Sequence, residues 1–400
     1  MPDLDADLAF LVTDLHARAA AAAWPEPPQI RHRGDRRTAR RRLAVAAAAL
    51  AAVAAIVAVS TSPIVRREPV QPTPSNTAPS GPPAPVSLLG LATVHHADDV
   101  SAVAAGAGSI WLAFGAGPLL PGGTPGELVR LDSATLKPLG SWSIAGSPSA
   151  IAVTDTSVWV AGDVADARPV SVGADQVVEY DLDGHVRHTY PVVSPMSLAA
   201  DGSAVWVQHG ATGDDRAQLT RLHDGVADPA IALMASLPQR GQPLRVCPGG
   251  VVVASQNHTA PTTYVQRVAD GRSVDIGWAP ATGFVTLGCG AEGAVLVLTP
   301  DPCAAYRVRF PGGILTRALT LPPFTSGQAV AGSLAWLSTI DNANHTTVIW
   351  PIDTNTWISG TSIALPGDFS VAVADGNRVW TVGADPNQPG QTLVAALSSE

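Results

Sequence analysis

One short phrase returns along the chain: an apolar stretch, a turn of Gly, Asp or Ser, and a second apolar stretch that contains a tryptophan. Its clearest copy is "SPSAIAVTDTSVWVAG" at residues 147–162. The tryptophans of the five full copies are Trp111, Trp159, Trp206, Trp336 and Trp380. Two β-strands joined by a tight turn have this pattern. The sequence therefore predicts a β-hairpin that recurs along the chain.

The interval between Trp206 and Trp336 has room for two more copies, and two weaker ones are present. They read "RVCPGGVVVAS" and "LGCGAEGAVLVLT", with Val253 and Leu296 near the tryptophan position. The repeat is then about 45 residues long, and each hairpin precedes a second alternating pair such as "GELVRLDSATLKPLGSWSI". Four strands in a repeat of this length are typical of a β-propeller blade, whose bulky apolar residue packs on the next blade.

The two ends of the repeat region complement each other. Only "QTLVAALSSE" follows the last hairpin, so the last blade lacks its outermost strand, whereas "VSLLGLATVHHA" stands unpaired before the first hairpin. Pairing these two segments closes the ring and removes the exposed edges. We predict an all-β, seven-bladed β-propeller at residues 87–400, with six or eight blades as the alternatives if a weak copy is misread.

Residues 43–65 contain no charged side chain, and as a helix they reach about 35 Å, enough to cross a bilayer. Seven arginines between residues 31 and 42 flank the start of this run, and Arg66 and Arg67 flank its end. This asymmetry predicts one transmembrane helix with a cytosolic N-terminus and an extracytoplasmic C-terminal part. The alternative is an export signal cleaved near Ala58–Ser60. Residues 66–86 are rich in proline, which predicts a disordered, extended stalk.

Residues 1–42 form the predicted cytosolic segment. Five apolar side chains share one face of a short amphipathic helix: Leu4, Leu8, Leu11, Val12 and Leu15. Such a face predicts a cytosolic partner for residues 4–19, self-association, or contact with the membrane surface. The layout resembles that of membrane-anchored regulators such as the anti-sigma factors of actinobacteria, and the resemblance implies binding of a transcription factor through residues 1–42.

Composition and motifs exclude several classes of function. The net charge is −9 while the N-terminal segment is rich in arginine, so the exported part is acidic and we expect no nucleic-acid partner. The three cysteines form no zinc motif, and no H-E-x-x-H, G-x-S-x-G, P-loop or dinucleotide motif is present. We therefore expect no metal, no cofactor and no catalytic residue. Cys247 and Cys289 occupy matching turns and either pair, leaving Cys303 free, or remain thiols.

The hairpin form P-x-x-I-A-V-x-x-x-x-V-W-V, seen best at residues 148–160, resembles that of bacterial propellers of the YVTN and streptogramin-lyase-like type. The resemblance implies the propeller fold over residues 87–400. Members that are lyases hold a metal near the channel with histidine and acidic groups. The corresponding early positions of the inner strands here are Ser101, Ser149, Ser197, Arg245, Thr286, Gln328 and Ser370. They include no histidine, so we do not expect that activity here.

Propeller sites lie over the central channel, where loops from all blades converge. The loops after the tryptophan strands are the most elaborate, and they place Asp163, His209, Asp341 and Asp385 around the mouth, with Arg245 as the one cation near the axis. These five residues are the predicted ligand-binding residues. We expect a membrane-anchored, extracytoplasmic, non-catalytic module for an extracellular protein or small ligand. The alternatives are an exported propeller enzyme of lyase or lactonase type and an anti-sigma-like regulator.

Overall fold

The computed structural model describes most of residues 86–399, as well as the course of each strand named below. The segments that it leaves undescribed within this range are 97–99, 116–125, 145–146, 164–174, 212–213, 236–239, 258–261, 280–283, 290–293, 301–302, 311–313, 321–324 and the single residues 332, 342, 376 and 389. The predictions for the cytosolic segment, the transmembrane helix and the stalk, residues 1–85, lie outside the described residues. No helix among the described residues is long and apolar enough to span a membrane.

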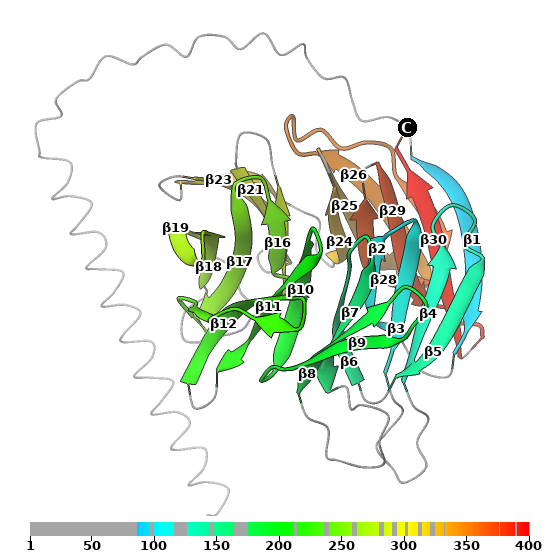
Figure 1. Cartoon of the computed structure of the whole chain (residues 1–400). Helices are drawn as coiled ribbons and strands as arrows, with labels where there is room; N and C mark the ends of the chain where they lie inside the picture. Colours follow the sequence, from blue (N-terminus) through cyan, green and yellow to red (C-terminus); the bar gives the residue numbers. More distant parts are fainter. Residues whose placement is uncertain are drawn as a thin grey trace, which may run out of the picture. The chain divides into compact units, whose positions relative to one another are not determined.

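The described residues form seven antiparallel sheets, and the prediction of a seven-bladed β-propeller is confirmed. We number the blades 1–7 from the sheet that begins with the second strand of the chain. The innermost strand of each blade lies against the innermost strands of both neighbours, which closes the ring (Figure 1).

Blades 1 to 6 run from the channel outwards in chain order, and blade 7 takes its outermost strand from the start of the domain. Blades 1 and 2 consist of β2 (Val100–Gly106), β3 (Ser109–Phe114), β4 (Gly126–Asp132) and β5 (Pro138–Ile144), then β6 (Ser147–Val153), β7 (Ser157–Asp163), β8 (Gln176–Asp181) and β9 (Val186–Pro191). Blade 3 consists of β10 (Pro195–Asp201), β11 (Ala204–Ala211), β12 (Asp214–His223), β13 (Val226–Ala227) and β14 (Ile231–Ala232). Blade 4 consists of β16 (Leu244–Cys247), β17 (Gly250–Asn257), β18 (Thr262–Ala269) and β19 (Arg272–Ala279).

Blades 5 to 7 complete the ring. Blade 5 consists of β20 (Phe284–Cys289), β21 (Ala294–Pro300), β22 (Cys303–Arg309) and β23 (Ile314–Thr320), with the short β15 (Arg240–Gln242) parallel to β20. Blade 6 consists of β24 (Thr325–Ala331), β25 (Leu334–Asp341), β26 (Thr346–Asp353) and β27 (Ile363–Pro366). Blade 7 consists of β28 (Asp368–Asp375), β29 (Arg378–Ala384), β30 (Gln391–Ser398) and β1 (Ser87–His95).

The ends of the ring close as the sequence predicts. The first strand, β1, pairs antiparallel with the last strand, β30, from Ser87 opposite Ser398 to His95 opposite Gln391. Blade 7 therefore takes its outermost strand from the start of the domain. The pairing completes blade 7, because β1 supplies the fourth strand that β28, β29 and β30 lack.

The tryptophan position holds neighbouring blades together. Trp111 is fully buried, and it packs with blade 2 residues such as Ile151 and Val160. Trp159, Trp336 and Trp380 pack in the same way on blades 3, 7 and 1. In blade 5 the position belongs to Leu296, which packs on blade 6, as predicted.

One register expectation needs a correction. In blade 4 the residue at the tryptophan position is Val252, which lies opposite Arg267 as Trp111 lies opposite Arg130. Val253 faces the other side of the sheet, since successive side chains of a strand alternate. Val252 packs against blade 5, and Val253 belongs to the cluster shared with blade 3.

An arginine on the third strand adds a polar link between blades. Arg130 lies over the Trp111 ring at 5.3 Å and donates a hydrogen bond of 2.9 Å to the carbonyl of Leu182 in blade 2. Arg307 of blade 5 lies over Trp357 of blade 6 and donates to the Thr354 carbonyl of the same blade. A guanidinium can stack on a ring and donate in its own plane at once, so one side chain secures both surfaces.

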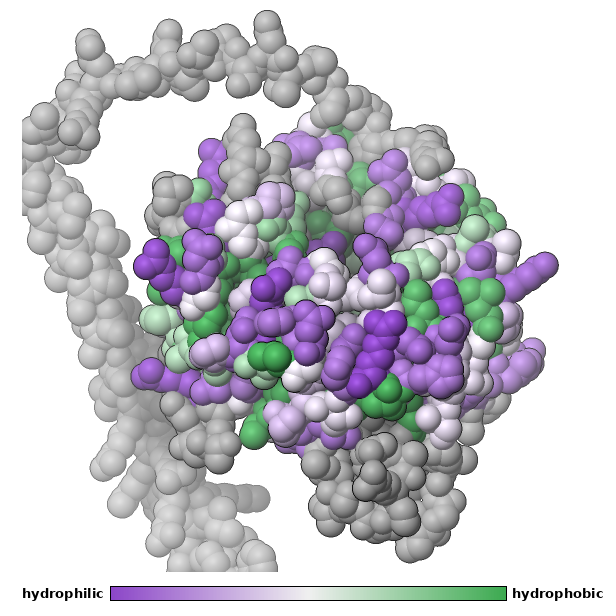
Figure 2. Space-filling view, in the orientation of Figure 1, coloured by the Kyte–Doolittle hydropathy of each residue, from purple (hydrophilic) through white to green (hydrophobic). Residues whose placement is uncertain are grey.

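Among the described residues, the exposed large apolar side chains belong to several blades. The exposed large apolar side chains lie on the outermost strands and loops of several blades, among them Leu139, Val186, Ile276 and Ile358. Figure 2 shows apolar residues interspersed with hydrophilic ones over the visible face. Scattered exposure of this kind is ordinary for a globular surface, and the main hollow of interest is the central channel.

Candidate functional site

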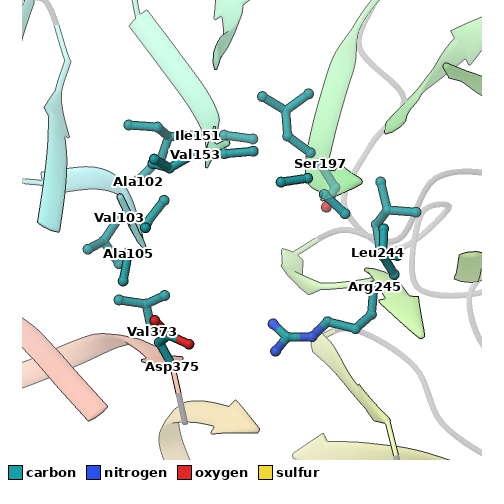
Figure 3. A pocket seen from close by; sticks show the side chains of 18 of the residues that line it. Ala102, Val103, Ala105, Ile151, Val153, Ser197, Leu244, Arg245, Val373 and Asp375 are labelled. Carbon is teal, nitrogen blue, oxygen red and sulfur yellow. The ribbon is translucent and has the colours of Figure 1, made fainter. Parts of the chain in front are cut away.

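A cavity of about 530 Å³ occupies the channel of the propeller. Its described lining comes from the inner strands of blades 1, 2, 3, 4 and 7 and from their adjoining turns. Its residues are mainly Ala, Val, Ile and Leu, including Ala102, Val103, Ile151 and Leu244, and three charged or polar kinds of side chain, Ser, Asp and Arg, stand among them (Figure 3). More of the exposed wall is polar than apolar, although most of its residues are aliphatic. A volume of this size is typical of a small-molecule site.

The inner strands carry small residues because they converge on the axis. Opposite the tryptophan position stand Ala104, Ala152, Ala199, Gly288, Ala329 and Val373 in six of the blades. Blade 4 reverses the sizes, since its inner residue is Arg245 and the residue opposite is Val252. In the other blades the larger side chain of this pair is on the second strand and is buried between sheets. In blade 4 the larger side chain is Arg245 on the inner strand, and its guanidinium reaches the channel.

Arg245 therefore stands two positions further along its strand than the sequence analysis places it. It corresponds to Ala199 of blade 3 and not to Ser197, because β16 begins later than the other inner strands. Its guanidinium extends into the cavity (Figure 3), and Nη2 donates a hydrogen bond of 3.1 Å to the carbonyl of Val330 in blade 6. The predicted location near the axis is thus found, and the side chain reaches past the inner strand of blade 5.

Two carboxylates share the cavity with this arginine. Asp375 ends β28 of blade 7, and its side chain faces Arg245 across the cavity (Figure 3). Asp155 lies in the turn between β6 and β7 of blade 2. Burial lowers the pKa of the Arg245 guanidinium, and the negative charge of Asp375 opposes that shift. The guanidinium stays charged, because arginine is not deprotonated in proteins.

Two of the three described serines that line the cavity have structural partners. Ser101 donates a hydrogen bond of 2.9 Å to the Ala113 carbonyl, and Ser149 donates to the carbonyls of Ala161 and Pro195 at 3.2 and 2.8 Å. Both serines lie at bulges near the starts of their inner strands. A nucleophilic serine needs an adjacent base, and no histidine is among the described residues that line the cavity.

The other predicted site residues lie elsewhere on the blades. Asp163 is the last residue of β7, where it pairs with Ser147. Asp341 ends β25 and accepts hydrogen bonds from the backbone and the side chain of Asn344. Asp385 follows β29 and accepts one from the backbone of Asn387. None of these three is among the described residues that line the cavity.

His209 is also separate from the cavity. It lies on β11 and is 8% exposed, with Nδ1 2.6 Å from the Gly210 carbonyl and Nε2 2.9 Å from the Thr220 hydroxyl. Burial lowers its pKa, and the hydrogen bond to Gly210 acts in the opposite direction. These contacts hold the imidazole within blade 3.

The two aspartates of the cavity thus lie at one rim of the channel. The longest loops in the sequence predict the site at the opposite rim. Asp155 and Asp375 belong to the turns that join the first and second strands of their blades, whereas Asp163, Asp341 and Asp385 belong to the rim where the second strand ends. Sequence reasoning missed the two carboxylates because an aspartate in such a turn is ordinary turn chemistry. Their position beside Arg245 is visible only once the blades are in place.

Neither a family model nor a curated protein matches this chain. The propeller fold itself permits many functions, so the cavity and its charges are the ground for a functional conclusion. Within the described part of the chain, no three His, Cys, Asp or Glu side chains lie close enough together to hold a metal ion.

The disulfide between Cys247 and Cys289 settles the alternative that the sequence leaves open. The two cysteines end the inner strands of blades 4 and 5, and their Cα atoms are 5.5 Å apart. Cys247 is two residues from Arg245, on the same short strand. The bond therefore fixes the inner strand from which the guanidinium extends.

Proposed function

We propose that this protein is a membrane-anchored, extracytoplasmic β-propeller that binds a small ligand or a partner's side chain in its central channel and catalyses no reaction. The single observation that carries the proposal is Arg245, a largely buried guanidinium that reaches the channel cavity and has only one hydrogen bond to the described part of the chain. A charge in such surroundings is costly unless it is paired, and a ligand with an anionic group would pair it.

The location rests on two further features. The uncharged run at residues 43–65 follows an arginine-rich segment, which supports a single crossing with the propeller outside. The Cys247–Cys289 disulfide also supports this location, because disulfides persist in oxidising compartments and are rare in the cytosol. In this arrangement residues 4–19 stay available to a cytosolic partner, which would link a ligand outside to a response inside.

Tags at both ends test the location. In intact protoplasts treated with protease, we expect loss of a tag placed after Glu400 and protection of a tag placed before Met1. Loss of the N-terminal tag from the mature protein, with the propeller released, would support the cleaved export signal instead. Protection of both tags would contradict export.

Arg245→Ala tests the binding site. We expect that some compound in a panel of amino acids, hydroxy acids, dicarboxylates and monosaccharides raises the melting temperature of the full-length protein in detergent. Arg245→Ala should weaken that compound's binding about tenfold or more, since it removes a charged contact, and leave the melting temperature without ligand unchanged. The control is Arg272→Ala, which removes an exposed arginine of β19. Equal affinity in the protein with Ala at position 245 would reject the site.

A further inference from the structure

The charges of the channel face each other without pairing. The Arg245 guanidinium and the Asp375 carboxylate point toward one another across the cavity (Figure 3), and no ion pair joins these two described residues. Arginine has five N–H donors, of which one is used on Val330. Asp375 is exposed to the channel solvent and belongs to a different blade. Each group is thus free to bind a ligand charge of the opposite sign.

The balance of charge limits what kind of ligand fits. One guanidinium and two carboxylates, those of Asp155 and Asp375, give the described lining a net negative charge. A simple anion at Arg245 is therefore repelled by the two aspartates, and a simple cation at Asp375 is repelled by the arginine. A molecule that carries both charges places each beside its opposite and has no net charge of its own.

The remaining wall sets the third requirement. Val103 and Val373 lie on the same side of the cavity as Asp375, whereas Ile151 and Val153, which pack with Trp111, lie further from the two charges (Figure 3). A small aliphatic group of a ligand that contacts these side chains would stabilise the complex through the apolar surface that it removes from water.

We infer that the channel binds a zwitterionic compound with a small aliphatic body, its carboxylate on Arg245 and its ammonium on Asp375, as in a free aliphatic amino acid or a short peptide. The inference rests on the proposed function and narrows its ligand to one chemical class. An amino acid and a dipeptide differ in the separation of their two charges, so binding of each reports which spacing the site accepts.

Four probes test the inference by calorimetry with the full-length protein in detergent. They are L-leucine, the dipeptide Ala-Leu, N-acetyl-L-leucine, which lacks the ammonium, and L-leucinamide, which lacks the carboxylate. We expect one of the two zwitterions to bind about tenfold or more tightly than either blocked compound, because each block removes a charged contact.

Charge-neutral variants assign each contact. In Arg245→Gln, the preferred zwitterion and L-leucinamide should bind equally, because the carboxylate has lost its partner. In Asp375→Asn, the zwitterion and N-acetyl-L-leucine should bind equally. The matched controls, Arg272→Gln and Asp270→Asn, alter exposed residues of blade 4 and should retain the full tenfold preference.

The outcomes separate this inference from the proposed function. If N-acetyl-L-leucine binds as tightly as the zwitterions and loses affinity in Arg245→Gln, the channel is an anion site: the proposed function stands and the zwitterion inference is wrong. If none of the four probes binds, the inference is wrong, and the wider compound panel decides the proposed function. If a zwitterion binds but both variants bind it unchanged, the site lies elsewhere and both are wrong.

Discussion

Blades 1 and 2 differ from blades 4 and 5 in what holds them together. Between blades 1 and 2, Trp111 fills the interface, with Trp142 stacked on it at 5.5 Å and Arg130 over its ring at 5.3 Å. Between blades 4 and 5 the equivalent residue is Val252, a much smaller side chain, and a disulfide joins the two inner strands. One architecture is thus stabilised by aromatic packing on one side and by a covalent link on the other.

The difference also explains where the site lies. In blades 1 and 2 the residue opposite the tryptophan on the inner strand is an alanine, Ala104 or Ala152. Where the tryptophan is replaced by Val252, the inner strand can carry Arg245, whose side chain leaves the interface for the channel. The interface with the smaller side chain at the tryptophan position is therefore the one whose blade supplies the channel's cation.

Truncation of the two equivalent residues should give the largest contrast. Trp111→Ala should lower the free energy of unfolding by about 3–5 kcal/mol, because it removes a fully buried indole and leaves a cavity. Val252→Ala removes two methyl groups and should cost about 2 kcal/mol. Urea unfolding of the two variants beside the parent protein measures both values. Equal losses would contradict the assignment of blades 1 and 2 as the interface that depends on the aromatic residue.

Reduction of the disulfide should have the next largest effect and should act on the other half. The bond spans a sequence separation of 42 residues, and its loss should cost about 2–4 kcal/mol. Hydrogen exchange should show the loss in β16 and β20 and leave β2 and β6 protected. Cys247→Ser should reproduce the reduced protein and show no further change with reductant.

Alkylation counts the thiols directly. We expect one labelled cysteine, Cys303, in the unreduced protein and three after reduction, since the sequence has three cysteines and two are bonded. Three labels without reductant would contradict the disulfide. In that case the two halves of the ring would differ only in the size of one side chain.

Sequence reasoning found the ring because each blade repeats its own pattern. Hairpins with a tryptophan at a constant position predict both the count of blades and the pairing of β1 with β30. The register of blade 4 was harder, because Val251, Val252 and Val253 are three consecutive valines and alternation cannot tell them apart. A tryptophan identifies the side of the second strand that faces the next blade. Where it is absent, the sequence does not show which side that is.

The site was less accessible to sequence than the fold. Arg245 was identified because it is the one cation on an inner strand, but its position was counted from the strand start. Bulges near the starts of β2, β6 and β28 lengthen those strands, and β16 has none. Asp375 matters only because the ring brings blade 7 opposite blade 4. Residues that face each other across the axis are brought together only by closure of the ring, so no local sequence pattern predicts them.

Blade 3, which lies between the two halves, should respond to acid. His209 is buried in this blade with a lowered pKa, chiefly because burial disfavours the charged imidazole. In the unfolded chain the same group titrates at its ordinary value of about 6.5. Above that pH both states are neutral here and the blade has its full stability. As the pH falls below that value the unfolded state takes up the proton first, so the free energy of unfolding decreases by at most about 1.4 kcal/mol per pH unit from this group.

A substitution that cannot titrate should remove this part of the acid response. His209→Gln should flatten the dependence of unfolding free energy on pH between about 6.5 and 5, whatever it costs at neutral pH. The matched control is His95→Gln, on the exposed edge of β1, which should keep the parent slope. Trp206 of blade 3 is half-buried and packs on blade 4. Acid should therefore destabilise the interface between blades 3 and 4. If the unfolding free energy of His209→Gln depends on pH as steeply as that of the parent protein, another group causes the acid response. Blade 3 would then not be the pH-sensitive part of the ring.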